Sequence, residues 1–534
     1  MSKHKQAPVG DDSEFTDKLA DIVGAQYVLQ GEATEYFATD VYNRLKRPLA
    51  VVQPESVSQL QAVMACCQHY KIASTTRGGG ASYTDAYLPN RADCVILDLG
   101  RLKRIEEINE HDGYVTVECG VTWAELKNKL DPLGLRTPFW GPFSGLRATV
   151  GGSVSQNTLS HGSGAYGISA ESVIAMDIVV ADGSLLKTGS GAAQSPPFSR
   201  FFGPDLSGLF TGDCGSLGVK ARITLPLLRK RPAHQTISFA FNDFASMHQS
   251  MRQIALEKLE DSHFALDGAL SQGQIARQDS PRQMLAIALS ILKTSPSYLQ
   301  GIKQLLLSAL AAKKVMSESP YMTHYIVEGV NQLEAKSRLQ RLREINRPFA
   351  REVAGTVPAV VRGMPFAPFF NTLGPAGERW VPLHGVLPHA QVLNFHQALN
   401  ALYTQYQDDM KRFGIWHGGM FSAIGSSGFL YEIALYWPDS ITCYHREVIP
   451  KAYLDKLPSY PENLEARRFV ERLKNQIIQL FSDFTAVNFQ LGKAYPYAQR
   501  LQPQALRLTR AIKACLDPDH LIAPGNLGLD SDGV

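Results

Sequence analysis

Arg77-Gly78-Gly79-Gly80-Ala81-Ser82-Tyr83 is the stretch of sequence that decides the fold of this chain. A strand predicted at residues 72–76 leads into it, after a strand at residues 50–52 and a helix that begins at Ser56. Glycine has no Cβ, so successive backbone N–H groups of such a loop can converge on a pyrophosphate, and the Ser82 hydroxyl adds a donor. The stretch predicts a phosphate-binding loop at the end of a βαβ-like unit, with a plain structural turn as the alternative.

Two further glycine-rich stretches lie within the first 220 residues. The second runs from Thr149 to Asn157 and continues at residues 162–167, where Gly162, Gly164 and Gly167 match the GxGxxG pattern of nicotinamide-dinucleotide sites. That pattern needs a strand before it, a helix after it and an acidic residue about twenty positions later. Polar residues precede these glycines and we expect a strand soon after them, so we reject a nicotinamide site. The third stretch, residues 212–219, leads into a strand at residues 220–225.

The composition is that of an ordinary globular protein, with 44% hydrophobic and 19% charged residues in 534. The 53 basic and 50 acidic residues nearly cancel, which indicates neither a nucleic-acid nor a membrane-surface partner. The polar start at residues 1–15 lacks the apolar core of a secretory signal, and the most apolar helix-like run, residues 305–312, is too short to span a bilayer. Seven scattered cysteines without CxxC spacing indicate reduced thiols, and we expect a cytoplasmic protein.

The predicted elements divide the chain into three parts. Residues 1–230 alternate strands and helices around the glycine stretches. Residues 231–485 combine longer helices with strands, of which residues 430–437 form the clearest one. Residues 486–534 contain a helix that runs into Asp517-Pro518.

The glycine stretches and the tail from Leu516 to Gly525, in this order and spacing, resemble the vanillyl-alcohol oxidase / p-cresol methylhydroxylase superfamily. The resemblance covers nearly the whole chain. It implies an α+β fold in which a two-part, PCMH-type FAD-binding domain (residues 1–230 and 486–534) carries an inserted α+β cap domain (residues 231–485), with FAD as the cofactor.

The same resemblance assigns residues to the cofactor. The loop at residues 77–83 would hold the pyrophosphate, the second stretch would run beside the ribityl chain and flavin ring, and the third would lie near the adenine or ribityl part. The candidates are Arg77, Gly78, Gly79, Gly80, Ala81, Ser82, Tyr83, Gly151, Gly152, Ser155, Asn157, His161, Tyr166, Gly167, Gly218 and Val219.

Three branches of the superfamily make different predictions. The sequence pattern of the cap and C-terminus is most similar to that of D-lactate and glycolate dehydrogenase-like members. Where metal-dependent members of that branch carry a Glu-His pair, this chain has Ala486 and Val487, so we expect no metal. The phenol-oxidising branch places an aspartate where this chain has Ile168, which weakens that interpretation without removing it. A redox-neutral transferase like the alkylglycerone-phosphate synthases would need a phosphate and acyl-chain site that the sequence does not reveal.

Candidate catalytic residues come from the cap and the C-terminal part. The sequence offers His384, His417, Glu432, Tyr495 and Arg362. Alternation places Leu430, Glu432 and Ala434 on one face of their strand, where an unpaired carboxylate would cost several kcal/mol and must have a partner or a chemical role. Arg362 is the candidate clamp for a substrate carboxylate, although a surface arginine is the alternative. Each histidine could equally be a hydrogen-bonded structural residue.

We therefore expect a flavoenzyme with non-covalently bound FAD that takes a hydride from a small alcohol, preferably a D-2-hydroxy acid. Oxidation of a para-substituted phenol is the first alternative and a redox-neutral flavin transferase the second. The electron acceptor (oxygen, a quinone or a cytochrome) and the oligomeric state, with a homodimer as one option, stay open.

Overall fold

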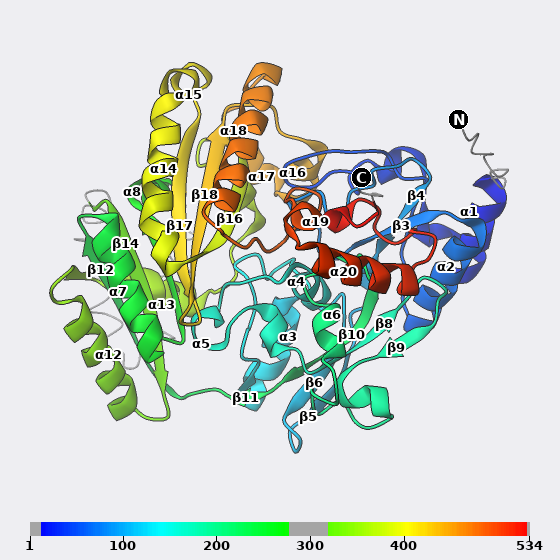
Figure 1. The fold of residues 1–534 in the computed structure, drawn as a ribbon, viewed down its shortest axis with the longest axis horizontal. Coiled ribbons are helices and arrows are strands. Elements are labelled where there is room, and N and C mark those ends of the chain that lie inside the picture. The colour runs from blue at the N-terminus through cyan, green and yellow to red at the C-terminus, as the bar shows by residue number, and fades with distance from the viewer. Residues whose placement is uncertain (1–11, 277–318, 531–534) are drawn as a thin grey trace.

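The computed structural model describes residues 12–276 and 319–530. Within these ranges the chain forms two lobes that lie side by side in Figure 1. We call them the glycine lobe (residues 12–230 and 486–530) and the cap lobe (residues 233–276 and 319–483). The apolar run at residues 305–312 lies outside the described ranges, and so do residues 1–11 of the polar start. No helix in the described ranges has the length and apolar character needed to cross a membrane.

The first sheet of the glycine lobe contains the predicted βαβ unit. Its strand order is β1-β2-β4-β3, where β1 (Val28–Leu29) is antiparallel to β2 (Ala50–Val52), and β2, β4 (Cys94–Asp98) and β3 (Ala73–Arg77) are parallel. Helix α2 (Val57–Tyr70) connects β2 to β3 and begins where the Ser56 side chain accepts the N–H of Gln59, as the sequence predicted. Because β3 ends at Arg77, the glycine stretch begins where the sheet ends.

The second sheet of the glycine lobe is antiparallel, in the order β5-β6-β10-β8-β9. Its strands are β5 (Ile105–Asn109), β6 (Tyr114–Glu118), β8 (Ala175–Val179), β9 (Leu185–Lys187) and β10 (Val219–Pro226). Helix α3 (Trp123–Leu130) follows β6 and begins with a reciprocal capping box between Thr122 and Glu125. This sheet brings the third glycine stretch, which precedes β10, next to the second stretch.

The second glycine stretch begins with a helix. Residues 150–156 form α4 (Val150–Gln156), which ends at Asn157 in the left-handed region with φ +49°. A Cβ on Gly151 would lie 2.8 Å from the carbonyl oxygen of Cys119, so the glycine lets this helix pack directly on the end of β6. The GxGxxG segment contains only the one-turn helix α5 (Ser163–Tyr166), and β8 begins nine residues later. That turn is too short for the crossover helix of a nicotinamide-dinucleotide unit.

The cap lobe is built on a seven-stranded antiparallel sheet in the order β15-β12-β14-β13-β17-β18-β16. Its strands are β12 (Ala233–Phe241), β13 (Ser262–Asp267), β14 (Tyr321–Gly329), β15 (Arg351–Val353), β16 (Arg379–Pro388), β17 (Trp416–Ile424) and β18 (Gly428–Trp437). Its main helices are α7 (Phe244–Glu257), α12 (Gln332–Asn346), α13 (Thr356–Gly363), α14 (Val392–Gln405) and α18 (Leu464–Asp483).

The two faces of the cap sheet have different neighbours. Helices α7, α14 and α18 cover one face, and Tyr431, Ile433 and Leu435 of β18 belong to the core beneath them. The alternate residues Leu430 and Ala434 lie on the opposite face, in smaller apolar clusters. The predicted alternation along β18 is therefore confirmed, and it turns Glu432 toward the glycine lobe.

The C-terminal segment packs on the glycine lobe. After α20 (Pro503–Leu516), Ile522 forms a parallel bridge with Ser74 of β3. The buried ammonium group of Lys513 lies 2.6 Å from Asp517 and donates to the carbonyl oxygen of Ser216, which fixes the tail to the third glycine stretch. The chain thus shows an α+β fold with an inserted cap, as predicted; the exact limits at residues 230 and 485 stay a prediction.

Candidate functional site

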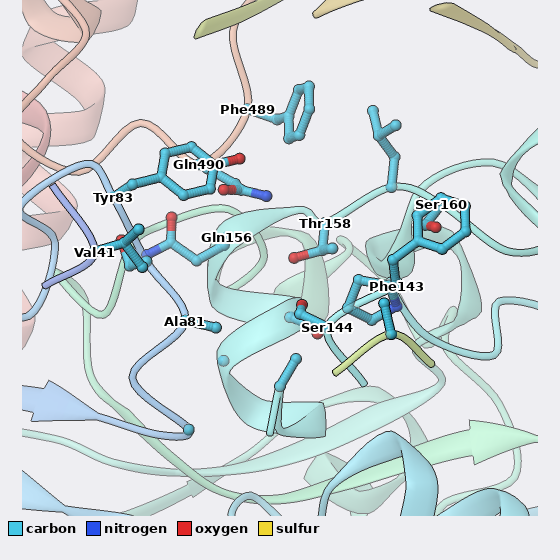
Figure 2. A pocket seen from close by; sticks show the side chains of 18 of the residues that line it. Val41, Ala81, Tyr83, Phe143, Ser144, Gln156, Thr158, Ser160, Phe489 and Gln490 are labelled. Carbon is cyan, nitrogen blue, oxygen red and sulfur yellow. The ribbon is translucent and has the colours of Figure 1, made fainter. Parts of the chain in front are cut away.

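A cavity of about 930 Å³ lies between the two lobes. The glycine lobe contributes one wall through residues 78–83, α4 and residues 214–220, while β13, β17 and β18 of the cap sheet contribute the other. Figure 2 shows Ala81, Tyr83, Gln156 and Thr158 around this space, with Phe489 and Gln490 from the C-terminal segment. A cavity of this size is at the upper end of the range for small-molecule and cofactor sites.

The glycine wall is made by two backbone segments in direct contact. A Cβ on Gly79 would lie 1.7 Å from the carbonyl oxygen of Arg147, and one on Gly78 would lie 2.5 Å from Thr149 Oγ1. Gly80 has φ +66°, a conformation that other residues rarely adopt. Within the described chain, the N–H groups of residues 79–82 have no hydrogen-bond acceptor. Residues 79–82 line the cavity, so an acceptor for these N–H groups would have to come from a ligand or from solvent. The loop therefore fits the pyrophosphate of a dinucleotide.

Most of the residues predicted to bind FAD line the cavity. They are Gly78, Gly79, Gly80, Ala81, Ser82, Tyr83, Gly151, Gly152, Ser155, His161, Gly218 and Val219. His161 is buried, its Nε2 lies 2.8 Å from the carbonyl oxygen of Pro365, and burial lowers its pKa to about 4. A neutral imidazole at this edge of the cavity is thus the state near pH 7.

Four of the predicted FAD residues lie outside the cavity lining. Arg77 is buried beneath the loop, with its guanidinium 4.6 Å from the ring centre of Tyr36. Asn157 ends α4, and its amide fills the space beside Gly212. Tyr166 packs against Arg136, and Gly167 faces the carboxylate of Glu171. These four side chains do not line the cavity, and their contact with the cofactor stays a prediction.

The register of the cap sheet arranges the opposite wall. His384 of β16, Glu432 of β18 and Met420 of β17 are directly opposite one another across the three strands. Directly paired residues share a face, so these three side chains form a row on the face toward the glycine lobe. The adjacent row contains Val386, Leu430 and Ser422.

Glu432 is a half-buried carboxylate without a partner in the described chain. It lines the cavity, and no hydrogen bond or ion pair to its carboxylate occurs within the described chain. Burial alone raises its pKa to about 7. Leu430, Ala434 and Tyr436 surround it on the same strand, so nothing on the wall compensates the charge. The sequence analysis required a partner or a chemical role for this residue, and the structure supplies no partner.

His384 and Tyr495 lie behind the lining, next to Glu432. The His384 ring stacks on Phe489 at a centroid distance of 3.9 Å, and neither of its ring nitrogens has a hydrogen-bond partner. Burial lowers the pKa of His384 to about 3, so its ring is neutral near pH 7. The Tyr495 hydroxyl accepts the backbone N–H of His384 at 3.0 Å. Neither side chain borders the cavity, so both are better placed to position neighbouring groups than to contact a substrate.

His417 faces the wrong side of the sheet for catalysis, which corrects its candidacy. It pairs with Leu435 of β18 and therefore points toward the helix layer. There its ring stacks on Tyr403 of α14 at a centroid distance of 3.8 Å. Successive residues of β17 point to opposite faces of the sheet, so a shift of one residue in the pairing of β17 with β18 would change the face of His417. The sequence around His417 does not indicate this pairing.

Arg362 is engaged elsewhere, which corrects its role as a carboxylate clamp. Its Nη2 lies 2.9 Å from a carboxylate oxygen of Glu328, whose other oxygen lies 3.1 Å from Arg136. On the same helix, α13, Val357 and Val361 point into the cavity. The helix thus presents aliphatic side chains to the site and turns its arginine away from it.

The sequence analysis missed the apolar part of the cap wall. The cavity is also lined by Phe143, Phe264, Leu270, Val361, Trp380 and Tyr436. Tyr436 could have been found, since it continues the alternation of Leu430, Glu432 and Ala434. The others come from separate elements that only the tertiary fold brings together. Within the described residues, no group of three or more His, Cys, Asp or Glu side chains could hold a metal ion.

Comparisons with known proteins agree with this geometry. Residues 48–189 match the FAD binding domain family. Glycolate oxidase subunit GlcD of Escherichia coli K12 is 32% identical over 197 residues, which are 37% of this chain and 38% of that protein. The mitochondrial D-lactate dehydrogenase [cytochrome] of Arabidopsis thaliana is 31% identical over 191 residues, 36% and 32% of the two chains. The matched region thus spans less than half the length of these relatives.

Two solved structures share the fold over nearly the whole chain. p-Cresol methylhydroxylase with substrate bound has a TM-score of 0.72 at 18% identity and covers 98% of both chains. An alkyldihydroxyacetonephosphate synthase has a TM-score of 0.67 at 14% identity, over 97% of this chain and 86% of that one.

The fold and the glycine wall define an FAD-binding protein with an inserted cap, and FAD is its cofactor. More particularly, residues 48–189 match the FAD binding domain family, and nearly the whole chain shares the fold of p-cresol methylhydroxylase, as the resemblance implied.

Proposed function

We propose that this protein is an FAD-dependent oxidoreductase that oxidises an alcohol in the cavity between its two lobes, with Glu432 as the general base. The observation that carries the proposal is the unpartnered Glu432 carboxylate, which faces the glycine wall across the cavity. Relatives that match the glycine lobe are named as glycolate oxidase subunits and D-lactate dehydrogenases.

Each wall has a separate task in this reaction. FAD, when bound on the glycine wall, supplies a ring that accepts a hydride. Glu432 accepts the proton of the substrate hydroxyl, which leaves a carbonyl when the C–H hydride departs. A carboxyl with a pKa of about 7 suits this task, since it is largely ionised just above neutral pH and is still a strong enough base. The apolar side chains around Glu432 exclude water from the reacting atoms.

The names of the relatives support a D-2-hydroxy acid as the substrate, as the sequence analysis favoured. Oxidation of a phenol is the second candidate, since aromatic side chains line the cap wall. We further propose, from the sequence, that the flavin is bound non-covalently and that the protein is cytoplasmic. A homodimer is one option for the oligomeric state, and the electron acceptor stays open.

The test is anaerobic mixing of the oxidised holoenzyme with panels of 2-hydroxy acids, other alcohols and phenols. We expect the flavin absorbance to bleach with an alcohol, and Glu432→Gln to slow the bleaching without loss of FAD. Bleaching by phenols alone would replace the alcohol with the second candidate. Bleaching by no panel compound would contradict the oxidoreductase and favour a redox-neutral transferase.

A further inference from the structure

The charges that border the cavity are unsuited to an anionic substrate. Of the lysine and arginine side chains in the described chain, only Lys220 lines the cavity, and it forms a buried ion pair with Asp213. Lys220 also belongs to the glycine wall, where it follows Gly218 and Val219. Among the described residues of the cap wall, Glu432 is the only charged side chain that lines the cavity, apart from histidines.

The histidines of the lining do not supply the missing cation. Burial lowers the pKa of both His161 and His263 to about 4, so both rings are neutral near pH 7. A substrate carboxylate would therefore share a desolvated cavity with the Glu432 carboxylate, and two like charges in one such site disfavour each other. Binding of a free acid would keep Glu432 protonated and thereby remove the base.

Ser422 adds a second polar contact on the same face of the cap sheet. It stands opposite Leu430, two residues before Glu432, so the two side chains are diagonal neighbours on strands β17 and β18. Diagonal neighbours have Cα atoms roughly 7–8 Å apart. Two hydrogen bonds to adjacent oxygen atoms of one small molecule can bridge such a separation.

The hydroxyl hydrogen of Ser422 is available to a ligand. Nε2 of His263 lies 3.2 Å from Ser422 Oγ but already accepts the backbone N–H of Ala423 at 2.7 Å. That bond places the ring hydrogen on Nδ1, which lies 3.3 Å from the Glu260 carboxylate. The remaining intramolecular acceptor is the carbonyl oxygen of Ala423 at 3.4 Å, which makes a weak bond. Since Ser422 lines the cavity, it can donate to a substrate oxygen.

We propose that Glu432 and Ser422 select an uncharged 2-hydroxy carbonyl compound, such as an ester or amide of a 2-hydroxy acid with an apolar substituent, over the free acid. Its hydroxyl would face Glu432, and Ser422 would donate to its carbonyl oxygen. The apolar substituent fits among Phe264, Trp380 and Tyr436. This inference rests on the proposed oxidation of an alcohol with Glu432 as the base, and it replaces the free D-2-hydroxy acid by an uncharged derivative as the substrate class.

The test compares D-mandelate with its methyl ester, which differ in charge but keep the same hydroxyl and ring. With the wild-type holoenzyme at pH 8, we expect the second-order rate constant for flavin bleaching to be at least about tenfold larger for the ester. Faster bleaching by the free acid would overturn the inference and leave the proposed function intact. Bleaching by another alcohol but by neither mandelate compound would overturn it too. Bleaching by no alcohol would contradict the proposed function itself.

Binding without turnover separates the two side chains. Binding is measured by titrating each holoenzyme with ligand and following the flavin absorbance spectrum. We expect free mandelate to bind several-fold tighter to Glu432→Gln than to the wild type, because the repelling charge is gone. Adding Ser422→Ala to that variant should weaken binding of the ester about fivefold, the loss of one neutral hydrogen bond, whereas adding Ser422→Thr should not. Equal ester affinity with alanine and threonine would contradict the role of Ser422. Unchanged mandelate affinity in Glu432→Gln would contradict the role of the charge.

Discussion

The two walls of the cavity are specified by the sequence in different ways. The glycine wall acts through its backbone, since Gly78 and Gly79 pack against residues 147–149 and line the cavity with N–H groups that have no acceptor in the described chain. The cap wall acts through side chains such as Glu432 and Ser422, which reach the cavity because of the register between strands. A backbone site requires glycines at fixed places, whereas a side-chain site depends on how distant strands pair.

The largest expected effect is the loss of FAD binding when the glycine wall is disrupted. Gly79→Ala should abolish FAD binding, because its Cβ would lie 1.7 Å from the carbonyl oxygen of Arg147 and force the two segments apart. Gly191→Ala is the matched control, since the nearest atom to its Cβ would be 3.8 Å away. The measurement is the FAD content of the purified proteins. A Gly79→Ala protein with one FAD per chain would contradict this account of the wall.

The same difference explains what the sequence could predict. The strand before the first glycine stretch, the helix start at Ser56 and the strand at 430–437 are local patterns, and the structure confirms them. The face of Glu432 followed from alternation within one strand. The predicted roles of His417 and Arg362 were wrong. The orientation of His417 depends on the pairing of β17 with β18, and that of Arg362 on its ion pair with Glu328. Neither contact leaves a local signal in the sequence.

The next largest effect is expected on the bleaching rate when the charge of Glu432 is removed from the cap wall. Glu432→Gln should slow flavin bleaching by an alcohol about 10²–10⁴-fold, the range for loss of a general base, while the FAD content stays unchanged. Glu465→Gln is the control for the same chemical change, because its carboxylate is exposed on α18. The measurement is the bleaching rate in anaerobic stopped flow. Equal rates in the two variants would remove Glu432 from the reaction.

A smaller effect distinguishes the two faces of the cap sheet. His384 is opposite Glu432 on the cavity face, whereas His417 faces the helix layer. Replacing the His384 ring by an apolar one should raise the pKa of Glu432 further, so His384→Phe should shift the pH midpoint of bleaching upward. His417→Phe keeps the stacking on Tyr403 and should leave the midpoint unchanged. A larger shift from His417→Phe would reverse the assignment of the faces.

The smallest expected effect is that of metal removal. Neither wall needs a divalent ion in this account, since Glu432 provides the base and the metal-binding Glu-His pair expected from the resemblance falls on Ala486 and Val487. Treatment with a chelator, followed by its removal, should therefore leave the bleaching rate within experimental error. Restoration of a lost rate by zinc or manganese would contradict this prediction.

The pH dependence of the second-order rate constant for flavin bleaching by an alcohol tests the central claim most directly. Burial raises the pKa of Glu432 to about 7, and the base must be ionised to accept a proton. The wild-type rate should therefore rise about tenfold per pH unit below pH 7 and level off above it, and Glu432→Gln should lose this dependence. A wild-type rate that does not change through pH 7, or the same profile in Glu432→Gln, would contradict the role of Glu432 as the base.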